Sequence, residues 1–208
     1  MKKRNFGWGR KQGRSALGTL GLIAVGIAGG LGLGRLLWRS RARRREGPPL
    51  HTVPFVDLPR YMGTWYEIAS YPQRFQRGCM ATTATYTLRG AGEVEVVNRC
   101  RLHSVEGPEK VARGRARVAD PVTNARLKVQ FFWPFWSDYW IIELAPDYSW
   151  AAVATPDRDG LWVLSRTPHM DDETFAGIVT RLVRQGFEIG RLNRTMQSET
   201  DASPMRGF

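Results

Sequence analysis

Few side chains in this sequence form a pattern that could catalyse a reaction or hold a metal ion. The three histidines His51, His103 and His169 are scattered and lack the close spacing of a metal-binding motif such as H-E-x-x-H. Four aspartates lie where turns and a helix start are expected, rather than in a calcium-binding pattern: Asp157, Asp159, Asp171 and Asp172. The sequence therefore predicts no metal, no cofactor and no catalytic residue.

One carboxylate and one aromatic motif stand out from this background. The stretch 61–79, YMGTWYEIASYPQRFQRGC, places Gly63 and Trp65 in a G-x-W spacing at the start of a strand-like run. Glu67 follows Trp65 by two residues, so on a strand both side chains point to the same side. A buried carboxylate there could determine ligand specificity, and it could equally be half of a salt bridge.

The net charge of +12 is confined to the N-terminal segment. Residues 1–45 contain twelve lysines and arginines and no acidic residue, which leaves 19 basic and 19 acidic residues in 46–208. The remainder is thus neutral, and its charge does not point to a nucleic-acid partner.

Residues 15–34, SALGTLGLIAVGIAGGLGLG, are uncharged and close to the about 20 residues that a membrane-spanning helix needs. The run leads into arginines rather than a cleavage site, so we predict an uncleaved anchor in 1–45 with a transmembrane helix at about 15–37. Neither cysteine lies near it to accept a lipid. Basic residues are equally numerous on both sides and leave its orientation undetermined.

Within this predicted helix, Gly26, Gly30 and Gly34 repeat the G-x-x-x-G spacing that would allow a homodimer, although glycine is common in membrane helices anyway. We expect the arginines between 35 and 45 to lie at lipid headgroups rather than on nucleic acid.

After a proline-rich linker at 46–59, the chain alternates between strand-like runs and turns. This pattern predicts an all-β domain at 60–197, an eight-stranded up-and-down antiparallel barrel with one C-terminal helix, followed by a flexible tail at 198–208. The helix lies within 170–186, acidic at its start and basic at its end, and residues 187–197 can pair back on the barrel. The predicted strands are 63–71, 80–89, 93–102, 110–119, 125–133, 138–145, 149–155 and 160–166.

An eight-stranded barrel is just wide enough to enclose one small ligand. Alternation turns Val94, Val96 and Asn98 inward on one strand and Ala112, Gly114, Ala116 and Val118 inward on the next, and small residues there imply space. The large residues that could line a pocket are Tyr86, Phe131, Tyr139, Ile141 and Trp162. The alternative is a core that these side chains fill completely, and alternation alone does not exclude it.

Three motifs in this order resemble the bacterial lipocalins, which are related to apolipoprotein D: GTWYEIA (63–69), TATYTL (83–88) and PDRDGLWVLSRTP (156–168). The resemblance covers about 57–197. It implies a lipocalin barrel in which Trp65 closes the floor, Arg166 lies across the indole, and Gly63 lets the chain turn beneath. It also implies that the loop after the first strand lies at the open mouth, with Tyr71 and Phe75 as lid residues.

The resemblance also suggests a disulfide between Cys79 and Cys100, which would imply an oxidising compartment, whereas the alternative is two unrelated buried thiols. Related bacterial lipocalins carry a lipoprotein signal, and here the 15–34 helix would replace it. We therefore expect a single-pass inner-membrane protein with its barrel in the periplasm, and the outer membrane is the alternative.

The leading hypothesis is a non-enzymatic carrier that binds a small hydrophobic ligand, a fatty acid or lysophospholipid, in its barrel for envelope lipid storage or transport. The residues expected at the ligand are Tyr71, Phe75, Tyr86, Val96, Phe131, Tyr139, Ile141 and Trp162. A second hypothesis is an enzyme acting on a bound lipid, for which Cys79 would have to be a free thiol of lowered pKa. A third is that the basic N-terminal segment binds anionic lipid or nucleic acid as its main activity.

Overall fold

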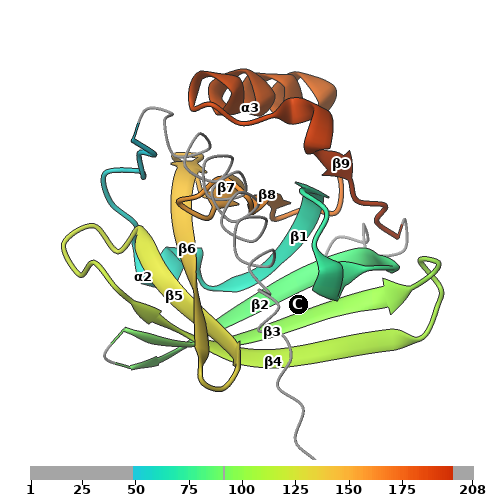
Figure 1. The fold of residues 1–208 in the computed structure, drawn as a ribbon, viewed down its shortest axis with the longest axis horizontal. Coiled ribbons are helices and arrows are strands. Elements are labelled where there is room, and N and C mark those ends of the chain that lie inside the picture. The colour runs from blue at the N-terminus through green and yellow to red at the C-terminus, as the bar shows by residue number, and fades with distance from the viewer. Residues whose placement is uncertain (1–48, 91, 199–208) are drawn as a thin grey trace, which may run out of the picture. The chain divides into compact units, whose positions relative to one another are not determined.

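The computed structural model describes residues 49–90 and 92–198, which are mainly β-strand (Figure 1). The predicted transmembrane helix at about 15–37, with Gly26, Gly30 and Gly34, lies outside the described residues, as does the predicted tail from position 199 onward. No helix in the described part of the chain is long and apolar enough to cross a membrane.

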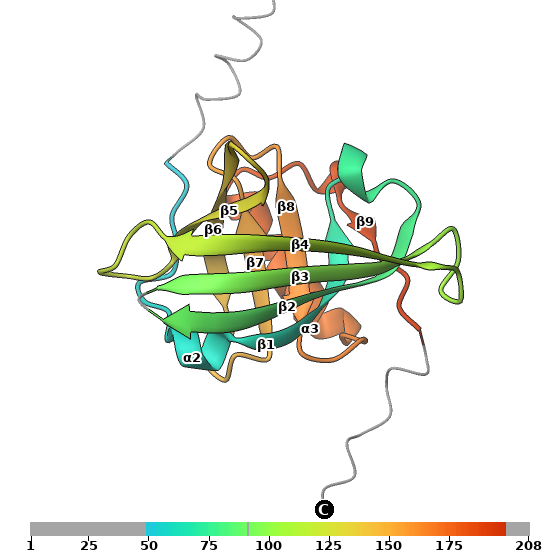
Figure 2. The same cartoon turned by 90° about the horizontal axis from the view of Figure 1, so that it is seen from below.

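Eight antiparallel strands form a closed sheet (Figures 1 and 2). Strand β1 pairs with β2 on one side and with β8 on the other, so that neither end of the strand order is left as an open edge. The predicted eight-stranded up-and-down barrel is thereby confirmed. The strands are β1 (Gly63–Ser70), β2 (Cys79–Gly90), β3 (Glu93–Leu102), β4 (Glu109–Val118), β5 (Arg126–Phe132), β6 (Phe135–Leu144), β7 (Trp150–Ala154) and β8 (Leu161–Ser165).

The strands bury two separate sets of apolar side chains because successive residues point to opposite faces of the sheet. The set inside the barrel surrounds Trp65 and includes Val94, Val96, Leu127 and Ile141. The set on the outer face lies beneath the helix α3 (Asp172–Arg184). Its members on the strands are Ile68 and Ala69 from β1, Ile142 from β6, Ala152 and Ala154 from β7, and Leu161 and Val163 from β8.

The helix α3 (Asp172–Arg184) packs on this outer face (Figure 1). Asp171 caps it by accepting a hydrogen bond from the backbone N–H of Thr174 at 2.7 Å. Ile178 and Leu182, one turn apart, are fully buried against the barrel. The predicted C-terminal helix is thus confirmed.

The two ends of the barrel differ. We call the end at which β1 begins the floor; the short helix α2 (Leu58–Tyr61) and the loops 119–125 and 145–149 lie there. Figure 2 shows α2 beside the end of β2. The opposite end, formed by the loops 71–78, 103–108, 133–134 and 155–160, is the mouth. The loop 71–78 contains the 3₁₀ helix η1 (Arg74–Gln76).

Residues 49–57, within the predicted linker, pack against the barrel. Leu50 and Val56 are buried. The backbone N–H groups of Val53 and Val56 donate hydrogen bonds to the carbonyls of Ile141 and Thr123. The buried packing therefore begins about ten residues before the predicted barrel boundary, because Leu50 packs with the set on the outer face and Val56 with the set inside the barrel.

The C-terminal segment lies between β1 and β2 near the mouth. These two strands pair only from Gly63 to Tyr66. Beyond that point, β9 (Asn193–Arg194) pairs with β1, and Ala81 of β2 donates a backbone hydrogen bond to Met196 at 2.7 Å. The segment beyond α3, which passes through the 3₁₀ helix η2 (Ile189–Arg191), thus pairs back on the barrel as predicted.

A contact between Trp65 and Arg166 joins the first barrel strand, β1, to the end of the last one, β8, at the floor. Trp65 is fully buried, and its indole N–H donates to the carbonyl of Tyr61 at 2.9 Å. The Arg166 guanidinium carbon lies 3.8 Å from the ring centroid of Trp65. Its two terminal nitrogens donate to the carbonyls of Thr64 at 2.9 Å and Arg60 at 2.8 Å. One side chain at the end of β8 therefore holds α2, β1 and the indole together.

Gly63 makes this arrangement possible. Its φ of +92° lies in the left-handed region, where a side chain is strained, and a Cβ there would stand 3.4 Å from a guanidinium nitrogen of Arg166. The turn beneath the barrel thus needs a glycine where the G-x-W motif supplies one.

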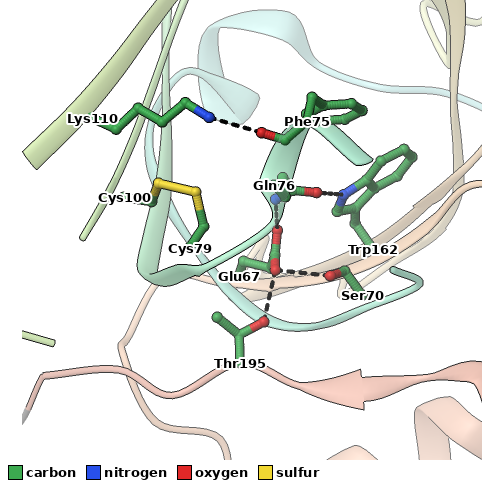
Figure 3. Close-up of a disulfide and its surroundings, with 9 residues drawn as sticks. All are labelled: Glu67, Ser70, Phe75, Gln76, Cys79, Cys100, Lys110, Trp162 and Thr195. Atoms are coloured by element: carbon green, nitrogen blue, oxygen red, sulfur yellow. Dashed lines mark hydrogen bonds between the residues drawn. A yellow bond between two sulfur atoms is a disulfide. The ribbon is translucent and has the colours of Figure 1, made fainter. Parts of the chain in front are cut away.

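A disulfide joins Cys79, at the start of β2, to Cys100 on β3, with 5.4 Å between the Cα atoms (Figure 3). The described residues contain no free cysteine. The disulfide suggested by the resemblance is confirmed, and the alternative of two separate thiols is wrong.

Replacing Arg166 should test the floor interaction. Arg166→Ala removes one cation–π contact and two hydrogen bonds, so we expect the free energy of unfolding to fall by about 2–3 kcal/mol. Arg166→Lys should recover less than half of this loss, because an ammonium cannot stack on the indole while reaching both carbonyls. Urea unfolding gives the values. Arg113→Ala on the exposed face of β4 is the control, and an equal loss in both alanine variants would contradict the assignment.

The double substitution Cys79→Ser/Cys100→Ser should lower the free energy of unfolding by about 3 kcal/mol, since the bond closes a loop with a sequence separation of 21 residues. The measurement is urea unfolding with and without a reductant. The reductant should destabilise the unmodified protein and leave the double variant unchanged. Equal stability of the two proteins in the absence of reductant would refute the estimate.

Candidate functional site

The six large or branched residues predicted to line a pocket come together inside the barrel. Tyr86, Val96 and Ile141 are buried members of the set around Trp65, and Phe131, Tyr139 and Trp162 pack against it while keeping part of their surface exposed. They come from five strands, β2, β3, β5, β6 and β8. Alternation was sufficient to find them, although the pairing register shifts between Met80 and Thr83 on β2 and between Val129 and Phe132 on β5.

Burial along the interior falls from the floor toward the mouth. On β5, Leu127 is buried, whereas the inward-facing Val129 and Phe131 are partly exposed. On β4, Ala116 is buried, whereas Gly114 and Ala112, nearer the mouth, are partly exposed. Apolar side chains that face inward and still keep exposed surface indicate that they do not fill this half of the barrel.

Gly114 also accommodates the aromatic side chain of Phe131. A Cβ at Gly114 would lie 2.7 Å from a ring carbon of Phe131 and 2.6 Å from the carbonyl oxygen of Gln130. The absence of a side chain at Gly114 therefore lets the Phe131 ring approach the backbone of β4 closely.

Three tyrosines form a hydrogen-bonded cluster above Trp65. The Tyr139 hydroxyl lies 2.8 Å from that of Tyr61 and 3.0 Å from that of Tyr86. The Tyr61 ring stacks on Tyr86 with centroids 5.9 Å apart and lies 5.0 Å from Trp65. This cluster gives the floor half of the interior a polar centre, to which Tyr61 contributes from α2, outside any predicted strand.

Burial determines the ionisation of this cluster. Desolvation raises the pKa of Tyr86 to about 12 and raises the pKa of both Tyr61 and Tyr139 well above the ordinary value of 10.0. All three hydroxyls are therefore protonated at neutral pH and can donate hydrogen bonds.

Glu67 lies at the polar junction shown in Figure 3, between the barrel wall and the mouth loop. Its buried carboxylate accepts hydrogen bonds from Gln76 at 2.7 Å, Thr195 at 2.7 Å and Ser70 at 2.9 Å. No cation in the described ranges lies within salt-bridge distance of it. Of the two interpretations from sequence, the salt bridge is therefore wrong for the described residues.

Glu67 also fixes the mouth loop through Gln76. The Gln76 amide donates to Glu67, and its carbonyl oxygen accepts from the indole N–H of Trp162 at 3.3 Å. Lys110 of β4 donates to the backbone carbonyl of Phe75 at 2.9 Å. The loop is thus tied to β1, β8 and β4. Sequence reasoning missed the contacts of Gln76 and Thr195 with Glu67. Gln76 lies in a different element from Glu67, and Thr195 is distant from it in the chain.

The two predicted lid residues differ in position. Phe75 lies on η1 at the mouth and is 59% exposed. Tyr71 begins the same loop, but its side chain packs away from the opening: it is buried on the outer face, lies edge-on against Phe187, and donates its hydroxyl to the carbonyl of Glu188 at 3.0 Å. This part of the prediction is wrong.

A β-bulge between Glu67 and Ala69 explains the position of Tyr71. Pairing with Trp162 turns Ser70 inward, whereas Ala69 pairs with the outward-facing Val163. The extra residue shifts the alternation by one, so Tyr71 follows Ala69 to the outer face beneath α3.

The enzyme hypothesis loses its nucleophile in this structure. Cys79 is bonded to Cys100 and offers no thiol. Across the described residues, no three histidine, cysteine, aspartate or glutamate side chains gather in a way that could hold a metal ion.

The tyrosine cluster predicts a fall in stability at alkaline pH. Below about pH 10 both folded and unfolded tyrosines hold their protons; from pH 10 through about 12 only the unfolded Tyr86 ionises, so the free energy of unfolding decreases. Tyr86→Phe should cost about 1 kcal/mol at neutral pH through its lost hydrogen bond. Between pH 10 and about 12, the free energy of unfolding of this variant should also decrease less than that of the unmodified protein, by about 2–3 kcal/mol in total. Urea unfolding over this pH range measures both, and parallel curves for the two proteins would count against the assignment.

Comparison with known proteins agrees with this architecture. Residues 56–197 match the family model described as a lipocalin-like domain. The chain is 39% identical over 164 residues to temperature-induced lipocalin-1 of Arabidopsis thaliana, covering 74% of this chain and 87% of that protein. It is 42% identical over 135 residues to outer membrane lipoprotein Blc of Escherichia coli (strain K12), covering 65% and 76%.

A solved structure has the same fold. Insecticyanin from the tobacco hornworm Manduca sexta aligns with a TM-score of 0.58 at 21% identity, covering 76% of this chain and 89% of that one. Since the family model spans all eight barrel strands and the relatives include bacterial lipoproteins at more than two-fifths identity, this chain belongs to the lipocalin family, as its motifs predicted.

Proposed function

We propose that the barrel binds one small hydrophobic ligand, a fatty acid or a lysophospholipid, and serves lipid storage or transport in the bacterial envelope. The observation that carries this proposal is the partly exposed apolar wall of the mouth half, formed by Ala112, Gly114, Val129, Phe131 and Trp162. An acyl chain against this wall would gain about 0.8 kcal/mol for each buried methylene.

The polar groups around this wall suit a ligand with one polar end. Arg74 and Arg77 flank Phe75 on the mouth loop, and both are exposed. They could meet an anionic headgroup, while the acyl chain extends toward the floor. The buried Glu67 carboxylate and the tyrosine cluster would then bound the apolar stretch at its two ends.

We further propose that the chain is tethered by the uncharged run at 15–34 to the inner membrane, with the barrel in the periplasm. The disulfide supports an oxidising compartment. Several relatives are named outer membrane lipoproteins, and the outer membrane is therefore the alternative location. A homodimer through Gly26, Gly30 and Gly34 would be compatible with this tether.

Two adjacent residues of β4 provide a matched test of the interior site. Ala112 faces inward opposite Asn98, and Arg113 faces outward. Ala112→Trp should fill the mouth half and weaken the binding of oleate and of oleoyl lysophosphatidylcholine at least about tenfold, which corresponds to the loss of roughly two buried methylenes. Arg113→Trp adds the same side chain outside and should leave the affinity within about twofold.

Binding would be measured by calorimetry on the full chain after near-ultraviolet circular dichroism has shown native packing in both variants. Equal affinity of Ala112→Trp and the unmodified chain would reject the interior site. Native mass spectrometry of the purified full chain, followed by lipid extraction, identifies any ligand that it already carries.

A further inference from the structure

The hairpin between β5 and β6 exposes three large aromatic side chains at the mouth. Phe132, Trp133 and Phe135 are 74%, 83% and 74% exposed. We call Phe132–Phe135 the aromatic tip. Single exposed apolar residues are common on protein surfaces, but three in a four-residue turn form a contiguous patch of the kind that marks a binding surface.

The strands below the aromatic tip are braced on both faces. On the outer face, the guanidinium carbons of Arg115 and Arg117 lie 5.4 Å and 4.5 Å from the ring centroid of Trp136. Arg115 also donates two hydrogen bonds to the side-chain oxygen of Gln130, at 3.1 and 2.9 Å. On the inner face, Phe131 packs against Gly114. The strand ends that carry the exposed aromatic side chains are therefore held in place by contacts on both faces of the sheet.

Basic side chains lie on two elements near the aromatic tip, the strand β4 and the loop 71–78. Arg113, Arg115 and Arg117 line the exposed face of β4, next to β5, and no carboxylate in the described ranges forms an ion pair with any of them. The aromatic tip itself contains no acidic residue. On the loop 71–78, also at the mouth, Phe75 is exposed between Arg74 and Arg77.

Aromatic side chains next to guanidinium groups that form no ion pair match the chemistry of an anionic bilayer surface. Tryptophan and phenylalanine enter the boundary between headgroups and acyl chains, and arginines remain at the level of the phosphates. Each basic side chain near such a surface adds attraction that disappears when the lipids are uncharged.

We propose that the aromatic tip is a membrane-docking surface, which enters the interface of a bilayer with anionic headgroups and brings the mouth against the lipid. This goes beyond ligand binding, because it assigns the place at which the barrel would meet its lipid source. Positive charge on both mouth segments favours an anionic bilayer over a second copy of this chain, whose same surface would repel it.

The test uses the full chain with a single fluorophore. Both native cysteines are in the disulfide, so one introduced cysteine can be labelled selectively with the polarity-sensitive dye NBD. Trp133→Cys places the dye on the aromatic tip. Val122→Cys is the matched control, because Val122 is 81% exposed on the floor loop 119–125 at the opposite end. Each labelled protein is mixed with vesicles of phosphatidylcholine, with or without phosphatidylglycerol, that carry a lipid-bound spin quencher.

With phosphatidylglycerol present, we expect the dye at position 133 to shift to the blue and be quenched by the lipid, and the dye at 122 to remain in water. With phosphatidylcholine alone the response at 133 should be at least about threefold weaker. This readout reports the depth of each dye, so it is valid whatever residues 1–48 contribute to attachment.

Three results would overturn the proposal: equal quenching at 122 and 133, no response at 133, or a response at 133 without dependence on anionic lipid. A concentration-dependent shift at 133 in the absence of vesicles would instead assign the aromatic tip to self-association, and would also overturn it. Oleate binding is measured separately on the same proteins. Loss of vesicle contact with retained oleate binding refutes only the docking surface, whereas the reverse refutes only the interior ligand site.

Discussion

The closure of the sheet through β1 is the constraint on which the rest of the structure depends. Eight antiparallel strands leave no edge only if the first strand pairs with both the second and the last. β1 does so near the floor, where Gly63–Tyr66 face β2 and Tyr66 pairs with Ser165 of β8. Arg166 follows directly and stacks on Trp65, so the side chain that secures the closure comes from the last barrel strand. Replacing Arg166 or Trp65 would therefore destabilise the whole barrel rather than one end of it.

The same constraint shapes the mouth. Because β1 and β2 pair over only four residues, the two strands diverge toward the mouth. Their backbone N–H and C=O groups beyond this point need other hydrogen-bond partners. The C-terminal segment supplies them: Thr195 donates to the carbonyl of Ile68, and Met196 accepts from Ala81. Glu67 lies where these segments meet and binds Thr195 and Gln76 together. The mouth loop is thus held by a carboxylate whose donors come from three different parts of the chain.

Local patterns in the sequence were sufficient for the strands, the helix and most inward-facing residues. Alternation is reliable where a strand is regular, and the 93–102 prediction coincides with β3 for this reason. It failed at Tyr71, because the bulge after Glu67 shifts the register and has no signature in residue type. It also missed the packing of 49–57 and the contact of Glu67 with Thr195, since these depend on contacts between residues more than sixty positions apart, such as Asn124 with Val56. The disulfide and the pairing of Trp65 with Arg166 came from the family resemblance rather than from spacing.

The β5–β6 hairpin links the interior to the outer surface at the mouth. Strand alternation turns Phe131 into the barrel and the next residue, Phe132, away from it. Trp133 and Phe135 continue the exposed set, and Trp136 returns to the outer face under two arginines. If the aromatic tip enters a bilayer, an acyl chain would meet aromatic side chains on both faces of the barrel wall. Phe131 lies on the inner face, and the aromatic tip follows it directly in the sequence. The Gln76 contacts hold the mouth loop to Glu67 and Trp162, and the two arginines at Trp136 hold the hairpin at the same end of the barrel. The segment proposed to meet the lipid and the loop beside the proposed ligand site are thus both fixed by contacts to the barrel wall.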